Sequence, residues 1–265
     1  MTRAAVLGSP IAHSLSPVLH RASYTALGLD WRYEAIECRE KDLPALLGRP
    51  WAGLSLTMPL KRAVLPLLDE VSELARAVGG ANTVVYDGGR RLGFNTDVYG
   101  MVTALAESGV RAPGSAVVLG GGATACSAIA ALRDLGLAKV AVVVRNPARA
   151  TEAVGAADRL GVEVTVRSFA DAVPDADLVI STLPAGAADT HAEPVARAAG
   201  ALFDVVYAPW PTVIAEAVRV RGGTVVGGFA MLLHQAVRQV SLMTGRDDVP
   251  VEAMRAAGLA ELGRR

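Results

Sequence analysis

From residue 116 onward, short runs of apolar residues alternate with stretches typical of helices, and this alternation limits the fold more than any other feature of the chain. Val140–Val144, for example, contains no polar residue, as expected of a strand buried on both faces. Such strands, separated by helices, form a parallel sheet that helices cover on both sides. We therefore expect strands at 116–119, 140–144, 162–166, 178–181, 202–206 and 224–226.

The first hundred residues also predict an α/β arrangement. Apolar runs indicate strands at 4–8, 31–36, 53–56, 83–86 and 92–94 and a helix at 17–27. Asp87-Gly88-Gly89 lies between the last two strands and is typical of a hairpin turn. Two helices, at 229–243 and 251–262, close the chain. The predicted fold is an N-terminal α/β domain at 1–97, a doubly wound Rossmann-type domain at 98–228, and C-terminal helices at 229–265 that return to the first domain.

Charge and cysteine content exclude several classes of protein. Lys and Arg number 26, as do Asp and Glu, so the chain lacks the basic excess typical of a nucleic-acid binder. Hydrophobic residues make up 52%, too many for a disordered chain. The two cysteines, Cys38 and Cys126, form no CxxC motif, so we expect no disulfide framework, no zinc site and a reducing cytoplasm. His13 and His20 lack ligands at metal spacing, and no metal is expected.

The mean hydropathy of +0.36 makes a membrane span worth testing. Residues 112–132 carry no charge and are long enough to cross a bilayer. Pro113 and Gly120-Gly121-Gly122 interrupt this segment, so a strand, a tight turn and a helix explain it better. The N-terminus does not have the pattern of a signal peptide. We expect neither a membrane partner nor a membrane anchor.

A glycine-rich loop in this segment predicts a dinucleotide site. Residues 120–125, Gly-Gly-Gly-Ala-Thr-Ala, fit G-x-G-x-x-G/A between a predicted strand and a predicted helix. Glycines at these positions let the backbone turn tightly and approach a pyrophosphate at the helix N-terminus. The alternative is a glycine-rich turn without a ligand. The surrounding strand–turn–helix–strand order favours the binding site.

The end of the next strand indicates which dinucleotide is bound. An NAD site usually has a carboxylate there, whereas this strand runs into Arg145, with Arg149 four residues later and no acidic residue between Lys139 and Arg149. Asn146-Pro147 predicts the start of the following helix. Two guanidinium groups suit the 2′-phosphate of NADP, although two solvated arginines are the alternative. We predict NADP as the cofactor.

Polar residues follow several predicted strands in the N-terminal half. Ser14 and Ser16 could bind a carboxylate or simply cap the helix that begins near Pro17. Lys61 is one of three lysines beside 23 arginines, and lysine, unlike arginine, can release a proton near neutral pH in a suitable environment. Asp97 could act chemically or cap a helix. Taken singly, none of these residues indicates a function.

Their ordered combination is more specific. Six motifs occur in sequence: G-x-P-I-x-H-S-x-S-P-x-x-H at 8–20, T-x-P-x-K at 57–61, G-A-N-T at 80–83, N-T-D-x-x-G at 95–100, D-x-x-Y-x-P-x-x-T at 204–212 and G-x-x-M-L-x-x-Q at 228–235. With them the chain resembles the shikimate dehydrogenase family from Gly8 to Gly245. The resemblance implies reversible NADPH-dependent reduction of 3-dehydroshikimate to shikimate, a step of chorismate and aromatic amino-acid biosynthesis, by a monomer or homodimer.

The resemblance also implies a role for each matching residue. Lys61 and Asp97 would form the catalytic pair. Substrate would be bound by these two residues and by Ser14, Ser16, Thr57, Asn82, Tyr207 and Gln235. Cofactor would be bound by Gly120, Gly121, Gly122, Ala123, Thr124, Arg145, Arg149, Val205 and Gly228.

The sequence departs from the common family pattern in the strand before Thr57 and around the predicted NADP site. Ser55 stands where Asn is frequent, and Val144, Asn146 and Cys126 differ from the usual residues near the cofactor.

Two other functions use the same scaffold. A quinate or quinate/shikimate dehydrogenase often changes one of the two serines in the first motif, and both are present here. A non-catalytic NADP-binding sensor could lose Lys61 or Asp97, and both are present.

Overall fold

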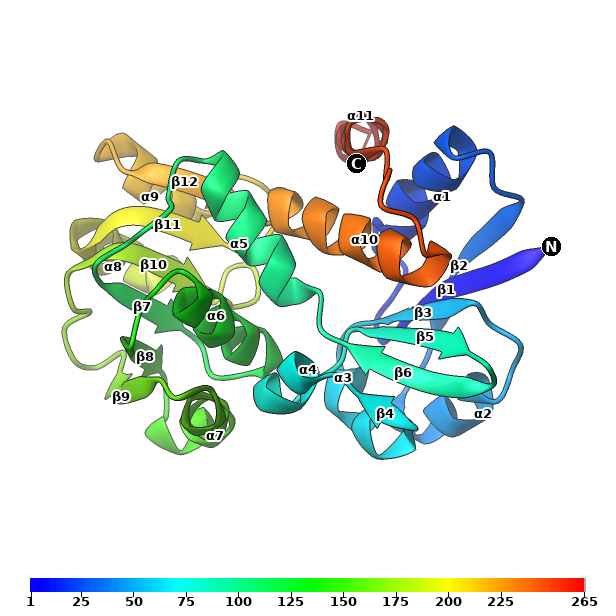
Figure 1. The fold of residues 1–265 in the computed structure, drawn as a ribbon. Coiled ribbons are helices and arrows are strands. Elements are labelled where there is room, and N and C mark those ends of the chain that lie inside the picture. Colours follow the sequence, from blue (N-terminus) through cyan, green and yellow to red (C-terminus); the bar gives the residue numbers. More distant parts are fainter. Residues whose placement is uncertain (265) are drawn as a thin grey trace. The chain divides into compact units, whose positions relative to one another are not determined.

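The computed structural model describes residues 1–264, which form two compact units (Figure 1). One consists of Met1–Thr96 together with the chain from Leu232 onward, and we call it the terminal unit. The other, the central unit, consists of Asp97–Met231. The terminal unit is therefore built from two segments that are far apart in the sequence.

A six-stranded mixed sheet forms the centre of the terminal unit. Its strands are β1 (Thr2–Gly8), β2 (Trp31–Glu37), β3 (Gly53–Leu56), β4 (Glu70–Val71), β5 (Thr83–Asp87) and β6 (Arg90–Phe94), in the order β2-β1-β3-β5-β6-β4. Strand β1 runs parallel to β2 and β3, whereas β5 is antiparallel to β3 and β6. The carboxyl ends of β1, β3 and β6 and the amino end of β5 therefore lie at one end of the sheet.

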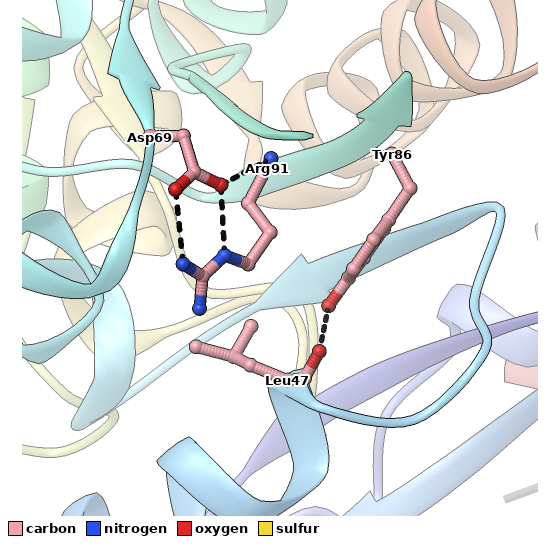
Figure 2. A network of polar contacts seen from close by, with 4 residues as sticks. All are labelled: Leu47, Asp69, Tyr86 and Arg91. Atoms are coloured by element: carbon pink, nitrogen blue, oxygen red, sulfur yellow. Dashed lines mark hydrogen bonds and ion pairs between the residues drawn. The ribbon is translucent and has the colours of Figure 1, made fainter. Parts of the chain in front are cut away.

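The predicted hairpin is confirmed between β5 and β6. Asp87 pairs with Arg90, and Gly88 and Gly89 both have positive φ angles, +56° and +81°, which a two-residue turn of this twist requires. Side chains fix both strands, as Figure 2 shows. Arg91 on β6 makes two side-chain hydrogen bonds of 3.0 Å to Asp69, and these lower the pKa of that carboxyl to about 2. Tyr86 on β5 donates to the carbonyl of Leu47 at 2.8 Å.

Helices complete the terminal unit. They are α1 (Ser16–Ala26), α2 (Leu43–Leu47), α3 (Leu60–Ala63), α4 (Glu73–Val78), α11 (Val251–Leu262) and most of α10 (Gly228–Thr244), with single 3-10 turns at Glu40–Asp42 and Leu65–Leu67. Helix α11 packs against α1, which confirms that the C-terminal helices return to the first part of the chain. None of the helices within residues 1–264 combines the length and the apolar character that crossing a bilayer requires.

The central unit has a parallel six-stranded sheet. The strands are β7 (Ala116–Leu119), β8 (Lys139–Val144), β9 (Glu163–Ser168), β10 (Ala176–Ser181), β11 (Ala199–Asp204) and β12 (Thr224–Gly227), in the order β12-β11-β10-β7-β8-β9. The helices are α5 (Asp97–Glu107), α6 (Ala123–Asp134), α7 (Thr151–Leu160), α8 (Ala192–Ala198) and α9 (Val213–Val220), with 3-10 turns at Pro147–Ala150 and Asp189–His191. This is the doubly wound Rossmann order, and the predicted α/β fold class is confirmed.

The strand order reverses between β7 and β10, which are neighbours in the sheet. Chains of this class bind ligands beyond the carboxyl ends of the strands at such a reversal, because the connections leave the sheet in opposite directions there. Strand β11 ends at Asp204, two residues before its predicted end. The carboxylate of Asp204 accepts the backbone N–H of Val206 at 3.2 Å, so a turn replaces the ladder.

Candidate functional site

The predicted substrate residues of the terminal unit gather at one end of its sheet. Ser14 and Ser16 follow β1, Thr57 and Lys61 follow β3, and Asn82 directly precedes β5. The pairing of the strands brings these segments to the same end of the sheet. The motifs at 8–20, 57–61 and 80–83 are thus close in space, as a shared site requires.

Backbone hydrogen bonds join these segments. The N–H of Ser9 donates to the carbonyl of Met58 at 2.9 Å, and the N–H of Ala81 donates to the carbonyl of Lys61 at 2.8 Å. A Cβ atom on Gly8 would lie 2.3 Å from the methyl group of Thr57, so only glycine leaves room for Thr57 there. Lys61 is half-buried in the short helix α3 and is held through its own backbone.

The two serines lie at the start of α1. Ser16 is its first residue and is buried, whereas Ser14 is half-buried. The residue at the N-cap position is Leu15, which makes no side-chain capping bond. Ser14 Oγ accepts the backbone N–H of Ser16 at 3.3 Å. The pair therefore sits at the positive end of the helix dipole, where a carboxylate is favoured.

Asn82 and Gln235 are brought together inside the terminal unit. Asn82 is buried, and its Oδ1 accepts the backbone N–H of Thr96 at 2.8 Å. Its Nδ2 donates to Thr96 Oγ1 at 2.9 Å and to Gln235 Oε1 at 3.4 Å. Gln235 Nε2 in turn donates to the carbonyl of Leu232 at 2.8 Å. Hydrogen bonds to protein groups therefore fix the orientation of both amides.

Asp97 and Tyr207 belong to the central unit. Asp97 follows Thr96 directly, is buried, and occupies the first position of α5 rather than its cap. Tyr207 is half-buried in the loop after β11. That loop is held by Asp204, whose carboxylate accepts the Thr212 hydroxyl at 2.7 Å. Burial raises the pKa of Asp204, and the Thr212 hydroxyl opposes this shift.

Behind Asn82 lies a buried group of polar side chains that the sequence did not reveal. Gln239 Oε1 accepts the Ser55 hydroxyl at 2.8 Å, and His20 Nε2 lies 3.2 Å from the same oxygen. The Tyr33 hydroxyl donates to Ser55 Oγ at 2.6 Å, and its ring stacks on His20 with centroids 3.9 Å apart. Burial lowers the pKa of His20 to about 3, so this imidazole stays neutral at physiological pH.

The neutral His20 predicts a loss of stability in acid. An unfolded histidine has a pKa near 6.5, whereas His20 in the folded chain has a pKa of about 3. Between these two values, the unfolded chain binds a proton at this residue and the folded chain does not, so acid favours unfolding. Stability from this group is therefore complete above pH 6.5 and falls as the pH drops toward 3. The loss is at most roughly 5 kcal/mol of unfolding free energy.

Urea unfolding of wild-type protein and His20→Gln between pH 7 and pH 4 measures this effect. We expect the wild type to lose more unfolding free energy than the variant over this range. His13→Gln, which changes an exposed histidine, should behave as the wild type does. Equal pH dependence in wild type and His20→Gln would contradict the assignment.

The central unit contains a pocket of about 610 Å³ at the carboxyl end of β7. Its lining includes five residues that the sequence predicts to bind the cofactor: Gly120, Gly121, Gly122, Arg145 and Arg149. The remaining lining residues are Val144, Ala148, Thr151, Glu152, Phe169, Leu183, Pro184 and Ala187. Because β7 borders the reversal of strand order, the pocket lies where open α/β sheets generally bind their ligands.

Each of the three glycines has a different physical role. Gly120 has a φ of +108°, and a Cβ atom there would lie 2.5 Å from Thr182 Oγ1. A Cβ atom on Gly121 would lie 2.6 Å from the carbonyl oxygen of Arg149. Gly122 faces open space and precedes α6 without a side-chain cap. The first N–H groups of α6 are therefore available to an anion, which fits a dinucleotide pyrophosphate.

Arg145 and Arg149 are both exposed at the edge of this pocket. Asn146 Oδ1 accepts the N–H of Ala148 at 3.0 Å and so caps the segment between them, as predicted. The capped segment, however, is a 3-10 turn over Pro147–Ala150, and the α-helix begins only at Thr151. The sequence predicts a helix that starts at Asn146-Pro147 and has Arg149 in its first turn, and this is wrong, because Arg149 precedes the helix. Arg149 nevertheless lines the pocket.

Comparison with known proteins settles the family. The chain is 37% identical over 273 residues to a shikimate dehydrogenase (NADP(+)) of Thermus thermophilus, a match that covers 100% of this chain and 98% of that protein. The chain belongs to the shikimate dehydrogenase family. A model of the shikimate dehydrogenase substrate binding domain matches residues 6–84, and one of the shikimate 5'-dehydrogenase C-terminal domain matches residues 228–257. A model of the alanine dehydrogenase/PNT C-terminal domain matches residues 93–191.

Solved structures agree with this assignment to the shikimate dehydrogenase family. The shikimate dehydrogenase of Mycobacterium tuberculosis is 44% identical and superimposes with a TM-score of 0.90, covering 98% of this chain and 100% of its own. A shikimate 5-dehydrogenase of Thermus thermophilus, solved in complex with NADP(H) and shikimate, is 34% identical with a TM-score of 0.86. That match covers 98% of this chain and 99% of its own.

Four cofactor residues implied by the family resemblance do not line the pocket. Ala123 and Thr124 lie in the first turn of α6, and Val205 and Gly228 lie beyond β11 and β12. A Cβ atom on Gly228 would lie 2.0 Å from the carbonyl oxygen of Val205, so this close approach requires glycine.

Within residues 1–264, no group of three or more His, Cys, Asp or Glu side chains could hold a metal ion.

Sequence reasoning missed the apolar wall of the pocket. Phe169 directly follows β9, and Leu183 and Pro184 follow β10 by two and three residues. The signal was available for Leu183 and Pro184, because residues after the carboxyl end of a strand next to a reversal line the crevice. It was not available for Phe169, because β9 lies at the edge of the sheet and not beside the reversal. Phe169 also stacks on His191, with ring centroids 4.3 Å apart, so this side of the wall is rigidly held.

Proposed function

We propose that the chain is an NADP-dependent shikimate dehydrogenase, which reversibly reduces 3-dehydroshikimate to shikimate with NADPH. One observation carries the proposal: the terminal unit's sheet gathers a serine pair at a helix start, a half-buried lysine and two oriented amides at one end. These groups suit a small hydroxylated acid with a ketone to be reduced. The reaction belongs to aromatic amino-acid and chorismate biosynthesis.

The substrate's polar groups have matching partners. Ser14 and Ser16 bind its carboxylate through their hydroxyls, helped by the N-terminus of α1. Thr57, Asn82, Tyr207 and Gln235 contact the ring hydroxyls. Asn82 and Gln235 support this role most directly, because their amides are already fixed by hydrogen bonds to protein groups. A pocket that binds hydroxyls with buried amides discriminates strongly against analogues that lack them.

Lys61 and Asp97 carry the proton chemistry. When hydride reaches a ketone carbon, negative charge develops on its oxygen. Lys61 donates a proton to that oxygen and takes it back in the reverse reaction. Asp97 orients the substrate hydroxyl and the lysine. Its negative charge at the first position of α5 is favoured by the helix dipole.

The pocket of the central unit fits the cofactor. The backbone of residues 120–124 receives the pyrophosphate, since Gly122 leaves the start of α6 open. Arg145 and Arg149 bind the 2′-phosphate, and Val205 and Gly228 approach the nicotinamide end. Bound NADPH supplies the hydride for the ketone carbon. The protein's part is to hold the two partners and to move the proton.

This function assigns roles to the parts of the chain. We propose that residues 1–97 bind substrate, that 98–228 bind NADP, and that 229–265 pack on the substrate domain, in a monomer or homodimer. Cys38 and Cys126 are both buried and neither is in a disulfide, in keeping with the reducing cytoplasm that we propose as the compartment.

The purified protein with shikimate and NADP tests the function directly. We expect NADPH absorbance to rise with shikimate and to rise far less with quinate at the same concentration. Quinate has an extra hydroxyl next to its carboxylate, which must fit against Ser14 and Ser16. Equal turnover of both acids would indicate a quinate/shikimate dehydrogenase. Cofactor binding without turnover of either acid would indicate a non-catalytic sensor.

A further inference from the structure

Gln239 lies one turn after Gln235 on α10 and is almost completely buried. Its Oε1 accepts the Ser55 hydroxyl at 2.8 Å and lies 3.2 Å from His20 Nε2. Its Nε2 donates to the carbonyl oxygen of Asn82 and to Thr83 Oγ1, both at 3.2 Å. Every hydrogen-bonding position of this amide is therefore used, in a place without access to water.

The surroundings fix which way the amide faces. The Tyr33 hydroxyl donates to Ser55 Oγ at 2.6 Å, so the hydrogen of Ser55 is left to point at Gln239 Oε1. The Asn82 carbonyl can only accept, so it must face the amide nitrogen. If the Gln239 amide were rotated by half a turn, its NH₂ group would face the hydroxyl hydrogen of Ser55 and its oxygen would face the backbone carbonyl oxygen of Asn82. Neither contact could be a hydrogen bond. The amide thus has one orientation.

Through this orientation Gln239 holds Asn82 at two points. Gln239 Nε2 donates directly to the backbone carbonyl oxygen of Asn82. It also binds Thr83, whose hydroxyl donates to Asn82 Oδ1 at 2.9 Å. Since Gln235 is one turn away on the same helix and contacts Asn82 Nδ2, the spacing of the two substrate amides depends on Gln239.

We propose that Gln239 is a positioning residue that sets Asn82 and Gln235 for the substrate's ring hydroxyls, an inference that rests on the proposed function. Gln239 acts through Asn82 and does not itself contact substrate. Ser55, Tyr33 and His20 support it from the opposite side. Fixed amides bind a hydroxyl more tightly than mobile ones, because less conformational freedom is lost on binding.

Steady-state kinetics of Gln239→Met test this role, since Met has a similar length and lacks the amide. We expect the KM for shikimate to rise about tenfold and the KM for NADP to stay within about twofold of the wild type. Arg238→Met, an exposed neighbour on α10, should leave both constants unchanged. An unchanged shikimate KM in Gln239→Met, or an equal rise in both KM values, would overturn the proposal.

A double-mutant cycle with Asn82→Ala separates positioning from general damage. In the Asn82→Ala background, Gln239→Met should change the shikimate KM by less than about twofold, because the Asn82 side chain, whose spacing from Gln235 it sets, is gone. A full tenfold effect in that background would show that Gln239 acts by another route. If Gln239→Met fails to fold, Ser55→Ala takes its place in the same cycle, because it removes the hydroxyl that donates to Gln239 Oε1. We expect Ser55→Ala to raise the shikimate KM by less than Gln239→Met would. An unchanged shikimate KM in Ser55→Ala would overturn the proposal.

Amide hydrogen exchange gives a readout that does not depend on turnover. The N–H of Thr96 donates to Asn82 Oδ1, so we expect it to exchange about tenfold faster in Gln239→Met, while the β8 amides of the central unit keep their rates. A wild-type protein that does not oxidise shikimate would refute the proposed function. A Thr96 exchange rate equal to that of the wild type would refute the positioning role alone.

Discussion

Lys61→Ala is expected to lose about 100- to 10,000-fold in kcat while binding shikimate nearly as well as the wild type. The lysine is the group that we propose protonates the substrate oxygen, and the methyl group of alanine cannot replace it. Substrate affinity should survive because the serine pair and the two amides remain. Stopped-flow turnover and calorimetric binding of shikimate measure the two quantities separately.

Two further lysine variants sharpen the interpretation. Lys61→Arg keeps the positive charge but cannot release its proton near neutral pH, so it should stay close to Lys61→Ala in kcat. Lys41→Ala removes an exposed lysine of the same unit outside the motifs and should behave as the wild type does. A kcat near the wild-type value in Lys61→Ala would remove this residue from the mechanism.

The double variant Arg145→Ala/Arg149→Ala should raise the KM for NADP by about two or more powers of ten. Each charge-assisted contact to a phosphate contributes roughly 1.5–3 kcal/mol, and every 1.4 kcal/mol corresponds to about tenfold. NAD carries no 2′-phosphate, so its weaker binding should barely change. Because both arginines are exposed, added salt should weaken NADP binding more than NAD binding in the wild type.

Kinetics with both cofactors at two salt concentrations provide the measurement. Arg133→Ala/Arg219→Ala is the matched control, since it removes two exposed arginines of the central unit that lie outside the pocket. The control should keep the wild-type preference for NADP. If the variant lacking Arg145 and Arg149 also keeps it, other residues must recognise the 2′-phosphate.

The fold was predictable wherever a segment is long enough to show its own pattern. Val140–Val144 and the helix after the glycine loop were found because buried strands are continuously apolar and the loop glycines mark the turn between strand and helix. Strand β4, with two residues, and helix α3, with four, are too short to show any period. Tertiary contacts alone decide their structure.

The candidate site divides in a similar way. Residues within one motif, such as Thr57 and Lys61, could be predicted because a few neighbouring residues in the sequence identify the motif. The contact between His20 and Gln239 joins residues 219 positions apart, and neither has a local pattern that indicates the other. The same holds for Phe169, which reaches the pocket only through the order of the strands.

The terminal unit is built from two ends of the chain, and this fixes an order of events during synthesis. The central unit is complete once Met231 has left the ribosome, whereas the rest of α10 and all of α11 emerge after it. Until then, the nascent sheet of the terminal unit has neither Gln235 nor Gln239 to place beside Asn82, and α1 has no α11 to cover it. The end of the sheet that we propose binds substrate is therefore completed only after the central unit, whose pocket is lined by residues between Gly120 and Ala187.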